Sequence, residues 1–550
     1  MNSTEILLVS DFNVEPLARV MANTRGLEML RARAAPFGQV YQQLARGSGS
    51  LFIWTRPEGV LPAFARAANF EEVDHALVLD EVDAFANAIL TASSSNVVFV
   101  ASWRSPTAGY GLLEWRPGLG LQHLVAAMNA RLADCLEAAS NVFLLDSSRW
   151  LRGVAKAESA TMWYATKSPF VTEVLKNASE DVARACAALR GESRRLIVLD
   201  LDETLWGGVV GETGWQGLRL GGHDYIGEAF KDFQRALRGL SNRGVQLAIV
   251  SKNDEAVALE AIDEHPEMLI RRSDLAGWRI NWNDKAGNVA ALIDELNLGP
   301  KSVVFLDDSP AERDRVRQAL PDVLVPDWPK SVVHYVDALR ALDCFDTATL
   351  SKEDRARKSM YVADRVRREV KGGIGSLDEW LQKIGTCVTV VDLTNANIGR
   401  SAQLLNKTNQ LNLSTRRLNE QELWEWVSDE ERRLQVVSAA DNFGDMGIVG
   451  LFSIERHGET AKLVDFVLSC RAMGRKIEEA MFYLALEHTK RMGAVRLEIE
   501  YLPTPRNGPT LAALAQAGVR PIANNRYELR IDDGYSLPSV VELRSPVATQ

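Results

Sequence analysis

Residues 196–204 read LIVLDLDET, a short apolar run that ends in two aspartates separated by one leucine. A run of this length without polar interruption is typical of a strand buried on both faces of a parallel sheet. Because side chains alternate along extended backbone, Asp200 and Asp202 should lie on the same side of the chain. The segment therefore predicts a buried strand with two carboxylates at its carboxyl end.

Two further apolar runs, Val245 to Val250 and Ser302 to Leu306, also end in reactive polar side chains. The first is followed by Ser251 and the second by Asp307 and Asp308. A parallel sheet gathers the carboxyl ends of its strands at one edge, where open α/β folds bind ligands. A helix is predicted between the first two runs by the helical spacing of Ile226, Phe230, Phe233, Leu237 and Leu240. We therefore expect a single cleft.

The paired aspartates are suited to phosphoryl transfer. Asp200 can attack phosphorus to form an acyl phosphate, while Asp202 protonates the leaving group and then activates water. Ser251 can donate a hydrogen bond to a phosphoryl oxygen, and Lys285, where an amphipathic helix begins, can neutralise developing charge. These four residues are the predicted catalytic groups of the cleft.

Carboxylates this close repel one another unless a cation intervenes, and hard oxygen ligands favour Mg²⁺. The predicted metal ligands are Asp200, Asp202, Asp307 and Asp308. Singly, each residue of the cleft has a structural explanation as a helix cap, a turn residue or a surface charge. Jointly, and in this order along the chain, they favour phosphoryl transfer.

The order DLDET, Ser251, Lys285, DDSP resembles that of the haloacid dehalogenase (HAD) superfamily of phosphotransferases. Between Asp202 and the helix near Ile226 the chain is short and glycine-rich, too short for a separate lid domain. A site without a large cap can admit a large substrate or a carrier protein.

A narrower resemblance is to the FkbH-like proteins, in subfamily IIIC of this superfamily. It rests on six motifs: MWYATKSPF (162–170), LDLDETLWGGVVGETG (199–214), NWNDKAGN (281–288), KTNQLNLSTRR (407–417), DNFGDMGIVG (441–450) and SCRAMGR (469–475). The resemblance covers most of the chain beyond residue 160. One departure is Glu203, where many relatives carry Asn, but on a strand its side chain would point away from its neighbours.

The resemblance implies an enzyme that removes the phosphate from an activated phosphoglycerate and loads the glyceryl unit onto an acyl carrier protein. The implied pathways make polyketides or surface polysaccharides, and the transfer uses an enzyme thioester. Cys470 is the candidate thiol, because it follows an apolar run and precedes Arg471 and Arg475, whose charges would lower its pKa. An equally weighted alternative makes Cys470 a small buried apolar residue.

The C-terminal part is also similar to the GNAT type of acetyltransferase. Arg471, Gly474 and Arg475 lie between an expected strand and helix, whose backbone N–H groups would face a pyrophosphate. Asn507 and the helix after it match a second element of that fold. The implied cofactor is phosphopantetheine or a CoA thioester; the alternative is a simple strand-to-helix turn.

The N-terminal part has apolar runs at residues 6–9, 51–54, 97–100 and 142–145, separated by amphipathic stretches. By analogy with relatives it resembles an SGNH-hydrolase-like α/β domain. Such an enzyme needs an early serine and a late histidine. The loop that begins at Ser10 is an imperfect match, and no histidine follows Asp146 before His223. We expect a scaffold or a partner-binding module, with hydrolase activity as the alternative.

A length of 550 residues predicts about three domains. We expect a multidomain α/β chain with an SGNH-like domain (1–165), a helical linker (166–192), a HAD-like domain with a Rossmannoid parallel sheet and no large cap (193–330), a helical connector (331–375) and a GNAT-like α+β domain (376–540).

Composition narrows the partners and the compartment. A net charge of −10 gives no broad electrostatic attraction to a phosphate backbone, so nucleic acid is not expected as a ligand. Five scattered cysteines without a CxxC pair indicate neither a disulfide framework nor a zinc site, and they favour the cytoplasm. No apolar stretch reaches 18 residues, so membrane insertion is not expected.

The leading hypothesis is a Mg²⁺-dependent phosphatase and acyl transferase that acts on a phosphorylated three-carbon acid and an acyl carrier protein. A second hypothesis is a small-metabolite phosphatase fused to a GNAT-type acyltransferase. A third is a non-enzymatic assembly factor that binds a carrier protein; the intact DLDET and DDSP motifs argue against it.

Overall fold

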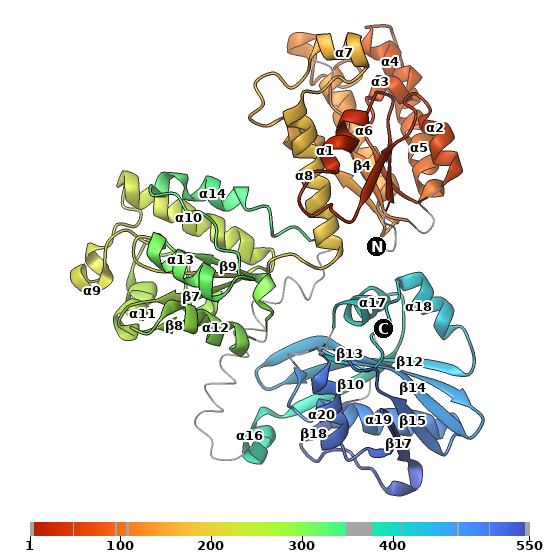
Figure 1. Ribbon diagram of the computed structural model, residues 1–550, viewed down its shortest axis with the longest axis vertical. Coiled ribbons are helices and arrows are strands. Elements are labelled where there is room, and N and C mark those ends of the chain that lie inside the picture. Colours follow the sequence, from red (N-terminus) through yellow and green to blue (C-terminus); the bar gives the residue numbers. More distant parts are fainter. Residues whose placement is uncertain are drawn as a thin grey trace. The chain divides into compact units, whose positions relative to one another are not determined.

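The computed structural model describes residues 5–47, 49–93, 96–105, 109–296, 298–347, 377–408, 410–469, 472–504 and 507–544. These residues form three β-sheets with helices beside them (Figure 1). One compact unit comprises Met1–Ser193 with Asp346–Ala348, and the other comprises Arg194–Phe345 with Thr349–Gln550. The expected class, a multidomain α/β protein with parallel sheets, is confirmed.

The N-terminal sheet has five parallel strands in the order β2-β1-β3-β4-β5. The strands are β1 (Glu5–Val9), β2 (Arg31–Ala34), β3 (Ser50–Ile53), β4 (Val98–Ala101) and β5 (Val142–Leu145). The helices are α1 (Glu15–Met21), α2 (Val40–Arg46), α3 (Pro57–Val60), α4 (Pro62–Ala68), α5 (His75–Ala92), α6 (Leu121–Leu136), α7 (Ala160–Thr166) and α8 (Thr172–Leu189). All four expected runs are strands. The edge strand β2, with sequence RARA, is not revealed by any apolar pattern.

Helix α8 differs from the expected linker at 166–192. Val174, Val182 and Cys186 are fully buried and share one hydrophobic cluster with Ile6 and Phe52 of the N-terminal sheet. An amphipathic helix gains by burying its apolar face, and here that face covers the sheet. Helix α8 is therefore part of the N-terminal unit, which ends at Ser193.

The central sheet has four parallel strands in the order β8-β7-β6-β9. The strands are β6 (Leu196–Leu199), β7 (Gln246–Ser251), β8 (Leu275–Ile280) and β9 (Val303–Leu306). The helices are α9 (Val210–Thr213), α10 (Tyr225–Asn242), α11 (Glu255–Glu264), α12 (Lys285–Glu295), α13 (Pro310–Ala319) and α14 (Tyr335–Ala341). The three expected strands are confirmed, and β8 is an additional edge strand.

Helices cover both faces of the central sheet. Ile197 and Leu199 of β6 lie in one cluster with apolar residues of α10, α11 and α14. Leu196 and Val198 lie in the other cluster, with residues of α12 and α13. Burial on both faces explains why β6 is apolar at every position, since neither face meets water.

The C-terminal sheet is mixed, in the order β16-β17-β15-β14-β13-β12-β10-β18, with β11 paired to β14. Its strands are β10 (Thr386–Asp392), β11 (Leu411–Asn412), β12 (Arg432–Asp441), β13 (Gly444–His457), β14 (Thr460–Leu468), β15 (Arg496–Glu500), β16 (Arg520–Ala523), β17 (Arg526–Arg530) and β18 (Val541–Arg544). Its helices are α16 (Leu377–Ile384), α17 (Ile398–Lys407), α18 (Glu420–Val427), α19 (Ile477–Arg491) and α20 (Gly508–Gln516). Helices α17 and α18 pack on one face, and α19 and α20 on the other.

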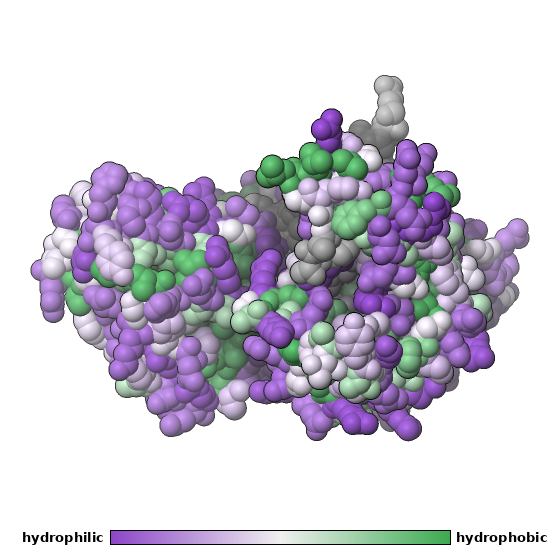
Figure 2. All heavy atoms as spheres, turned by 90° about the horizontal axis from the view of Figure 1, so that it is seen from above, coloured by the Kyte–Doolittle hydropathy of each residue, from purple (hydrophilic) through white to green (hydrophobic). Residues whose placement is uncertain are grey.

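Most of the expected connector at 331–375 lies outside the described residues, apart from α14 and the turn before it. Within the described part of the chain, no helix combines the length and hydropathy needed to cross a membrane. On the face drawn in Figure 2, hydrophilic side chains predominate and apolar ones lie in separate small groups.

Candidate active site

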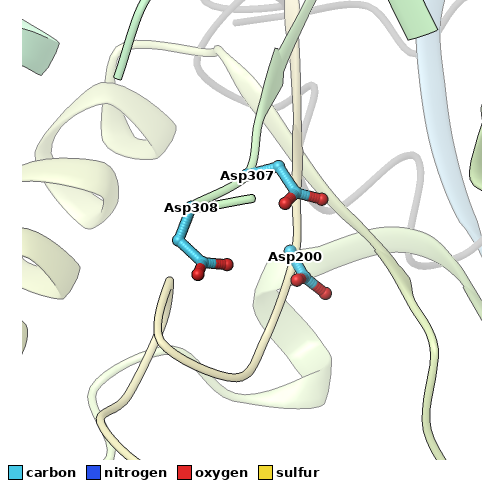
Figure 3. A group of neighbouring side chains, drawn as sticks. All are labelled: Asp200, Asp307 and Asp308. Carbon is cyan, nitrogen blue, oxygen red and sulfur yellow. The ribbon is translucent and has the colours of Figure 1, made fainter. Parts of the chain in front are cut away.

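Three carboxylates meet at the carboxyl edge of the central sheet. Asp200 directly follows β6, and Asp307 and Asp308 follow β9, which is the neighbour of β6 with Leu199 paired to Leu306. One oxygen from each of the three aspartates lies within 4.8 Å of the others (Figure 3). Two chain segments more than a hundred residues apart thus contribute to one acidic cluster, as parallel pairing predicts.

Lys285 lies between two of these carboxylates. Its Nζ is 2.8 Å from Asp200 Oδ2 and 2.6 Å from Asp307 Oδ2, and the residue is only 3% exposed. It is the first residue of α12, whose N-terminus is capped by Asp284. Burial alone would lower the pKa of Lys285, but the charges of Asp200 and Asp307 outweigh it, so the net pKa is raised.

Burial and neighbouring charge change the pKa values of Asp307 and Asp308. Burial, and then the charge of Asp200, raises the pKa of Asp307 to about 6, although Lys285 and the Ser309 backbone N–H oppose this change. Burial and Asp200 also raise the pKa of Asp308. A single ammonium group therefore does not balance the cluster.

The cluster has the features of a site for a divalent cation. Asp200 Oδ1 is buried and has no hydrogen-bond partner in the described structure. An oxygen without a donor, beside the carboxylates of Asp307 and Asp308, is a ligand that Mg²⁺ accepts. Asp200, Asp307 and Asp308 would hold the ion, which would screen an incoming phosphate from their negative charge.

The sequence predicted Asp202 to be a metal ligand, but its side chain is not part of this cluster. Its Oδ1 accepts hydrogen bonds from Trp206 Nε1 at 2.8 Å and from the Val210 backbone N–H at 3.1 Å. Its Oδ2 accepts one from Asn253 Nδ2 at 2.9 Å. Because β6 ends at Leu199, the alternation expected along a strand does not extend to Asp202.

The turn after Asp202 has a strained residue at its centre. Glu203 has a φ of 53°, in the left-handed region, where Asn and Gly carry a smaller steric cost. Its Oε1 accepts a hydrogen bond from the Gly208 backbone N–H at 2.7 Å, and its carbonyl accepts one from Tyr335 at 3.0 Å. The sequence pattern placed Glu203 on a strand. In the structure it is instead part of the turn that redirects the chain.

Ser251 is the last residue of β7 and is 2% exposed. Its hydroxyl lies 3.5 Å from Asn253 Nδ2, and its carbonyl accepts a hydrogen bond from the Asn281 backbone N–H at 3.1 Å. Asn253 thus links Ser251 to Asp202. The structure places all six residues predicted for the cleft at the carboxyl edge of this sheet.

Three supporting residues were not identified from the sequence. Thr204 Oγ1 lies 3.4 Å from Asp308 Oδ1 and accepts a hydrogen bond from the Asp308 backbone N–H at 3.1 Å. Arg313 donates to the carbonyls of Asp307 and Asp308, each at 2.7 Å. Asn253 orients Asp202. Only Thr204, the last residue of DLDET, has a motif position that could have singled it out.

Of the site residues predicted in the C-terminal region, the structure describes Gly474, Arg475 and Asn507. Cys470 and Arg471 lie outside the described residues. Arg475 is 7% exposed, and its guanidinium is 3.8 Å from Asp441 Oδ2. The Gly474 backbone N–H donates to Glu478 Oε1 at 2.7 Å.

Asn507 does not face a cofactor. It is fully buried, its Nδ2 donates to the carbonyls of Asn412 and Leu502, and its Oδ1 accepts from Tyr501 and the Thr504 backbone N–H. Both amide hydrogens and both lone pairs of the carbonyl oxygen are used within the fold. The prediction of Asn507 as a cofactor-binding residue is corrected on this basis.

In the N-terminal unit, the candidate serine has a structural role. Ser10 is 1% exposed, and its Oγ accepts a hydrogen bond from the Phe12 backbone N–H at 3.1 Å. Beside it, Asp11 accepts hydrogen bonds from the backbone N–H and side chain of Arg56. Among the described residues, no histidine is hydrogen-bonded to Ser10. The Ser10 hydroxyl is therefore part of the turn that follows β1.

No protein-family model and no curated protein matches this chain. A solved structure that does match is the N-terminal part of the protein BF1531 from Bacteroides fragilis, which contains a phosphatase domain and is complexed with Mg. The match has 26% identity and a TM-score of 0.56, and covers 63% of this chain and 94% of that chain. The covered share is larger than the segment Arg194–Phe345, so the likeness extends beyond it.

Acetyltransferases are also among the matches. The GNAT domain of S. lividans PAT has 15% identity and a TM-score of 0.21, covering 26% of this chain and 89% of that chain. The structure of yncA from Salmonella typhimurium with its cofactor acetyl-CoA has 13% identity and a TM-score of 0.21, covering 28% of this chain and 98% of that chain. These scores assign no activity to the C-terminal region.

The match to the Mg-bound phosphatase confirms the resemblance predicted from the motifs.

Proposed function

We propose that this chain, an enzyme that resembles the FkbH-like members of the HAD superfamily, is a Mg²⁺-dependent phosphatase coupled to acyl transfer. The observation that carries the proposal is the position of Lys285, which contacts Asp200 and Asp307, while Asp200 Oδ1 has no hydrogen-bond partner among the described residues. Asp200 Oδ1 is the oxygen that would bind Mg²⁺, and Oδ2, which lies beside the Lys285 ammonium group, is the oxygen that would attack a phosphoryl group. The 26% identical phosphatase domain with Mg supports the same conclusion.

In the proposed reaction, Asp200 attacks phosphorus and forms an acyl phosphate as the bond from phosphorus to the leaving oxygen breaks. Lys285 and the Ser251 hydroxyl hold the phosphoryl oxygens. Bound Mg²⁺ would offset the charge that the carboxylates and the phosphoryl group bring together. Water then attacks the acyl phosphate, releases inorganic phosphate and restores Asp200.

Asp202 moves the proton in both halves of the reaction. Its Oδ1 accepts two hydrogen bonds and its Oδ2 accepts one, so Oδ2 is the oxygen that can still carry the exchanged proton. It donates that proton to the leaving oxygen and recovers one from the attacking water. Trp206, the Val210 backbone N–H and Asn253 keep the carboxylate in one orientation throughout.

The proposed substrate is an activated, phosphorylated three-carbon acid, and the proposed acceptor of the glyceryl unit is an acyl carrier protein in polyketide or surface-polysaccharide synthesis. Support comes from the short connection between β6 and α10, which contains only the one-turn helix α9 and a 3-10 turn. Such a connection leaves room for a carrier-bound substrate. We propose Cys470 as the acyl-bearing thiol and the SGNH-like N-terminal unit as a scaffold.

Mass spectrometry of both proteins tests this proposal. The full chain is incubated with an activated phosphoglycerate, Mg²⁺ and a carrier protein, because a thioester forms only from a carboxyl group that carries a leaving group. A glyceryl mass on the carrier, together with free phosphate, is the expected result, and Asp200→Asn should abolish both. Phosphate release without carrier loading would leave the small-metabolite phosphatase as the function, and absence of both would favour the assembly factor.

Cys470→Ala separates the two chemical steps. This variant should still release phosphate but leave the carrier unloaded, because only the second step needs the thiol. The matched control is Cys387→Ala, since Cys387 is buried in β10. Loading that persists in Cys470→Ala would refute the thiol assignment while leaving the phosphatase assignment intact.

A further inference from the structure

The C-terminal sheet has a place where two parallel strands stop pairing. Strands β14 and β15 pair from Thr460 with Arg496 to Leu463 with Ile499, whereas β14 continues to Leu468. An open strand edge of this kind binds extended ligands that carry amide groups, in the way that a peptide adds a strand. The pantetheine arm of CoA, with its two amides, is such a ligand. The GNAT resemblance therefore implies that CoA would bind at this edge.

The edge is occupied by the chain itself. Strand β11 pairs antiparallel with the end of β14, with Leu411 opposite Leu468 and Asn412 opposite Val467. The next residue, Leu413, donates its backbone N–H to the Phe466 carbonyl at 3.1 Å, and its own carbonyl accepts from Leu502, beyond β15, at 3.2 Å. Residues 411–413 thus form a bridge from β14 to the segment after β15.

The bridging segment is buried and anchored. Leu411, Asn412 and Leu413 are at most 1% exposed. The Asn412 backbone N–H donates to Thr510 Oγ1 at 3.0 Å, and the Asn412 carbonyl accepts from Asn507 Nδ2 at 3.1 Å. The segment is therefore part of the folded core, and Asn507 and Thr510, at the start of α20, hold it in place.

The expected anion-binding turn is also occupied. A pyrophosphate at the start of α19 would need the free backbone N–H groups and the positive end of the helix. The Gly474 N–H already donates to the Glu478 carboxylate at 2.7 Å, and Glu478 is only 9% exposed. Glu479, the next residue, is ion-paired with Lys476 at 2.6 Å. The Glu478 side chain thus already occupies the place at Gly474 that an anion would take.

We infer that the C-terminal domain does not bind CoA between β14 and β15, because residues 411–413 and Glu478 occupy the positions of the pantetheine arm and the pyrophosphate. An acyl unit does not reach this domain as a CoA thioester at that edge. The inference concerns a different site from the proposed phosphatase and does not depend on that activity. It also separates this domain from an acetyltransferase that uses acetyl-CoA.

Isothermal titration calorimetry of the full chain with acetyl-CoA tests the inference directly. The expected result is no saturable heat up to about 1 mM acetyl-CoA, which is a weak-binding limit for a specific cofactor site. Hydrogen exchange of the same samples should show that the Asn412 and Leu413 amides exchange slowly and at the same rate with and without acetyl-CoA. Saturable binding accompanied by a change at these amides would overturn the inference.

A pair of variants tests whether the segment is anchored as described. Thr510→Val removes the oxygen that accepts from the Asn412 N–H, so that amide should exchange at least several-fold faster. Thr510→Ser keeps the oxygen and should exchange like the wild type. Equal exchange in the wild type and in Thr510→Val would show that the segment is not held by this bond and would refute the proposed occlusion. Circular dichroism confirms that both variants are folded.

Discussion

The side-chain amide of Asn253 donates a 2.9 Å hydrogen bond to Asp202 Oδ2 and so joins the loop after β7 to the loop after β6. Asn253 is 4% exposed, so this bond lies largely away from solvent. It fixes the orientation of the carboxylate that the proposed mechanism uses for proton transfer. Asn253 is a positioning residue, since it acts on the reaction through Asp202.

Replacing Asn253 should therefore reduce turnover more than substrate binding. We expect Asn253→Ala to lower kcat by about tenfold to a hundredfold, a part of the 10²–10⁴ that a well-placed acid/base contributes, with little change in KM. Steady-state kinetics with a phosphorylated glycerate measures both constants. The control is Asp254→Ala, which removes the N-cap of α11 and should cost about 1 kcal/mol of stability without altering kcat. An equal loss of kcat in both variants would contradict the positioning role.

Lys285 should be important for stability as well as for phosphate binding. It is buried between Asp200 and Asp307, and removing one partner of a buried ion pair typically costs about 3–5 kcal/mol. In EDTA, we expect Lys285→Met to lose about 3–5 kcal/mol of its free energy of unfolding, as measured by urea denaturation. Part of this stability should return in Mg²⁺. Lys252→Met, at a more exposed ion pair with Glu312, should change stability by less than about 1 kcal/mol. Equal stability of the two variants would be inconsistent with this account.

Mg²⁺ should stabilise the protein through Asp200. A ligand present at a hundred times its dissociation constant adds about 2.7 kcal/mol of stability to the folded state. Thermal denaturation should therefore show a higher Tm in Mg²⁺ than in EDTA for the wild type. We expect Asp200→Asn to lose most of this difference, whereas the exposed Asp232→Asn keeps it. A full Mg²⁺ response in Asp200→Asn would exclude Asp200 as a ligand.

The hydroxyl of Thr204 should be needed to hold Asp308. Thr204→Val has nearly the same shape but leaves the Asp308 backbone N–H without its acceptor, which costs about 1–3 kcal/mol for a buried group. Thr204→Ser keeps the oxygen and should lose less. We expect the denaturation midpoint to fall in the order wild type, Thr204→Ser, Thr204→Val. If Val were as stable as the wild type, the bond would have no structural importance.

Glu478 should make stability fall as the pH rises. Burial raises its pKa above the ordinary value of 4.5, so the folded state holds a proton that the unfolded state has lost once the pH exceeds that value. Stability is then fully present below about pH 4.5 and declines as the pH rises through the folded-state pKa. Glu478→Gln, which can still accept from Gly474, should flatten this dependence. A difference in stability between variant and wild type that is constant from pH 4 to pH 8 would contradict the assignment.

Some features of the fold follow from local sequence alone. The runs before Asp200, Ser251 and Asp307 are apolar at nearly every position because these strands are buried on both faces. Strands β2 and β8 lie at sheet edges, where one side lacks a neighbouring strand, and their sequences carry weaker apolar patterns. Their existence depends on pairing with a strand that is already in place.

The amino-acid sequence by itself determined which side chains follow the buried strands of the central sheet, and hence that Asp200, Ser251 and Asp307 would meet at one edge. Periodicity and motif order can be recognised along the chain. Parallel pairing of the strands then brings the residues at their carboxyl ends together. Only the tertiary structure decided where Asp202 points and what fills the edge of β14, because both depend on hydrogen bonds between distant segments. The bonds from Asn253 to Asp202 and from Asn507 to Asn412 are of this kind, and no spacing along the chain encodes them.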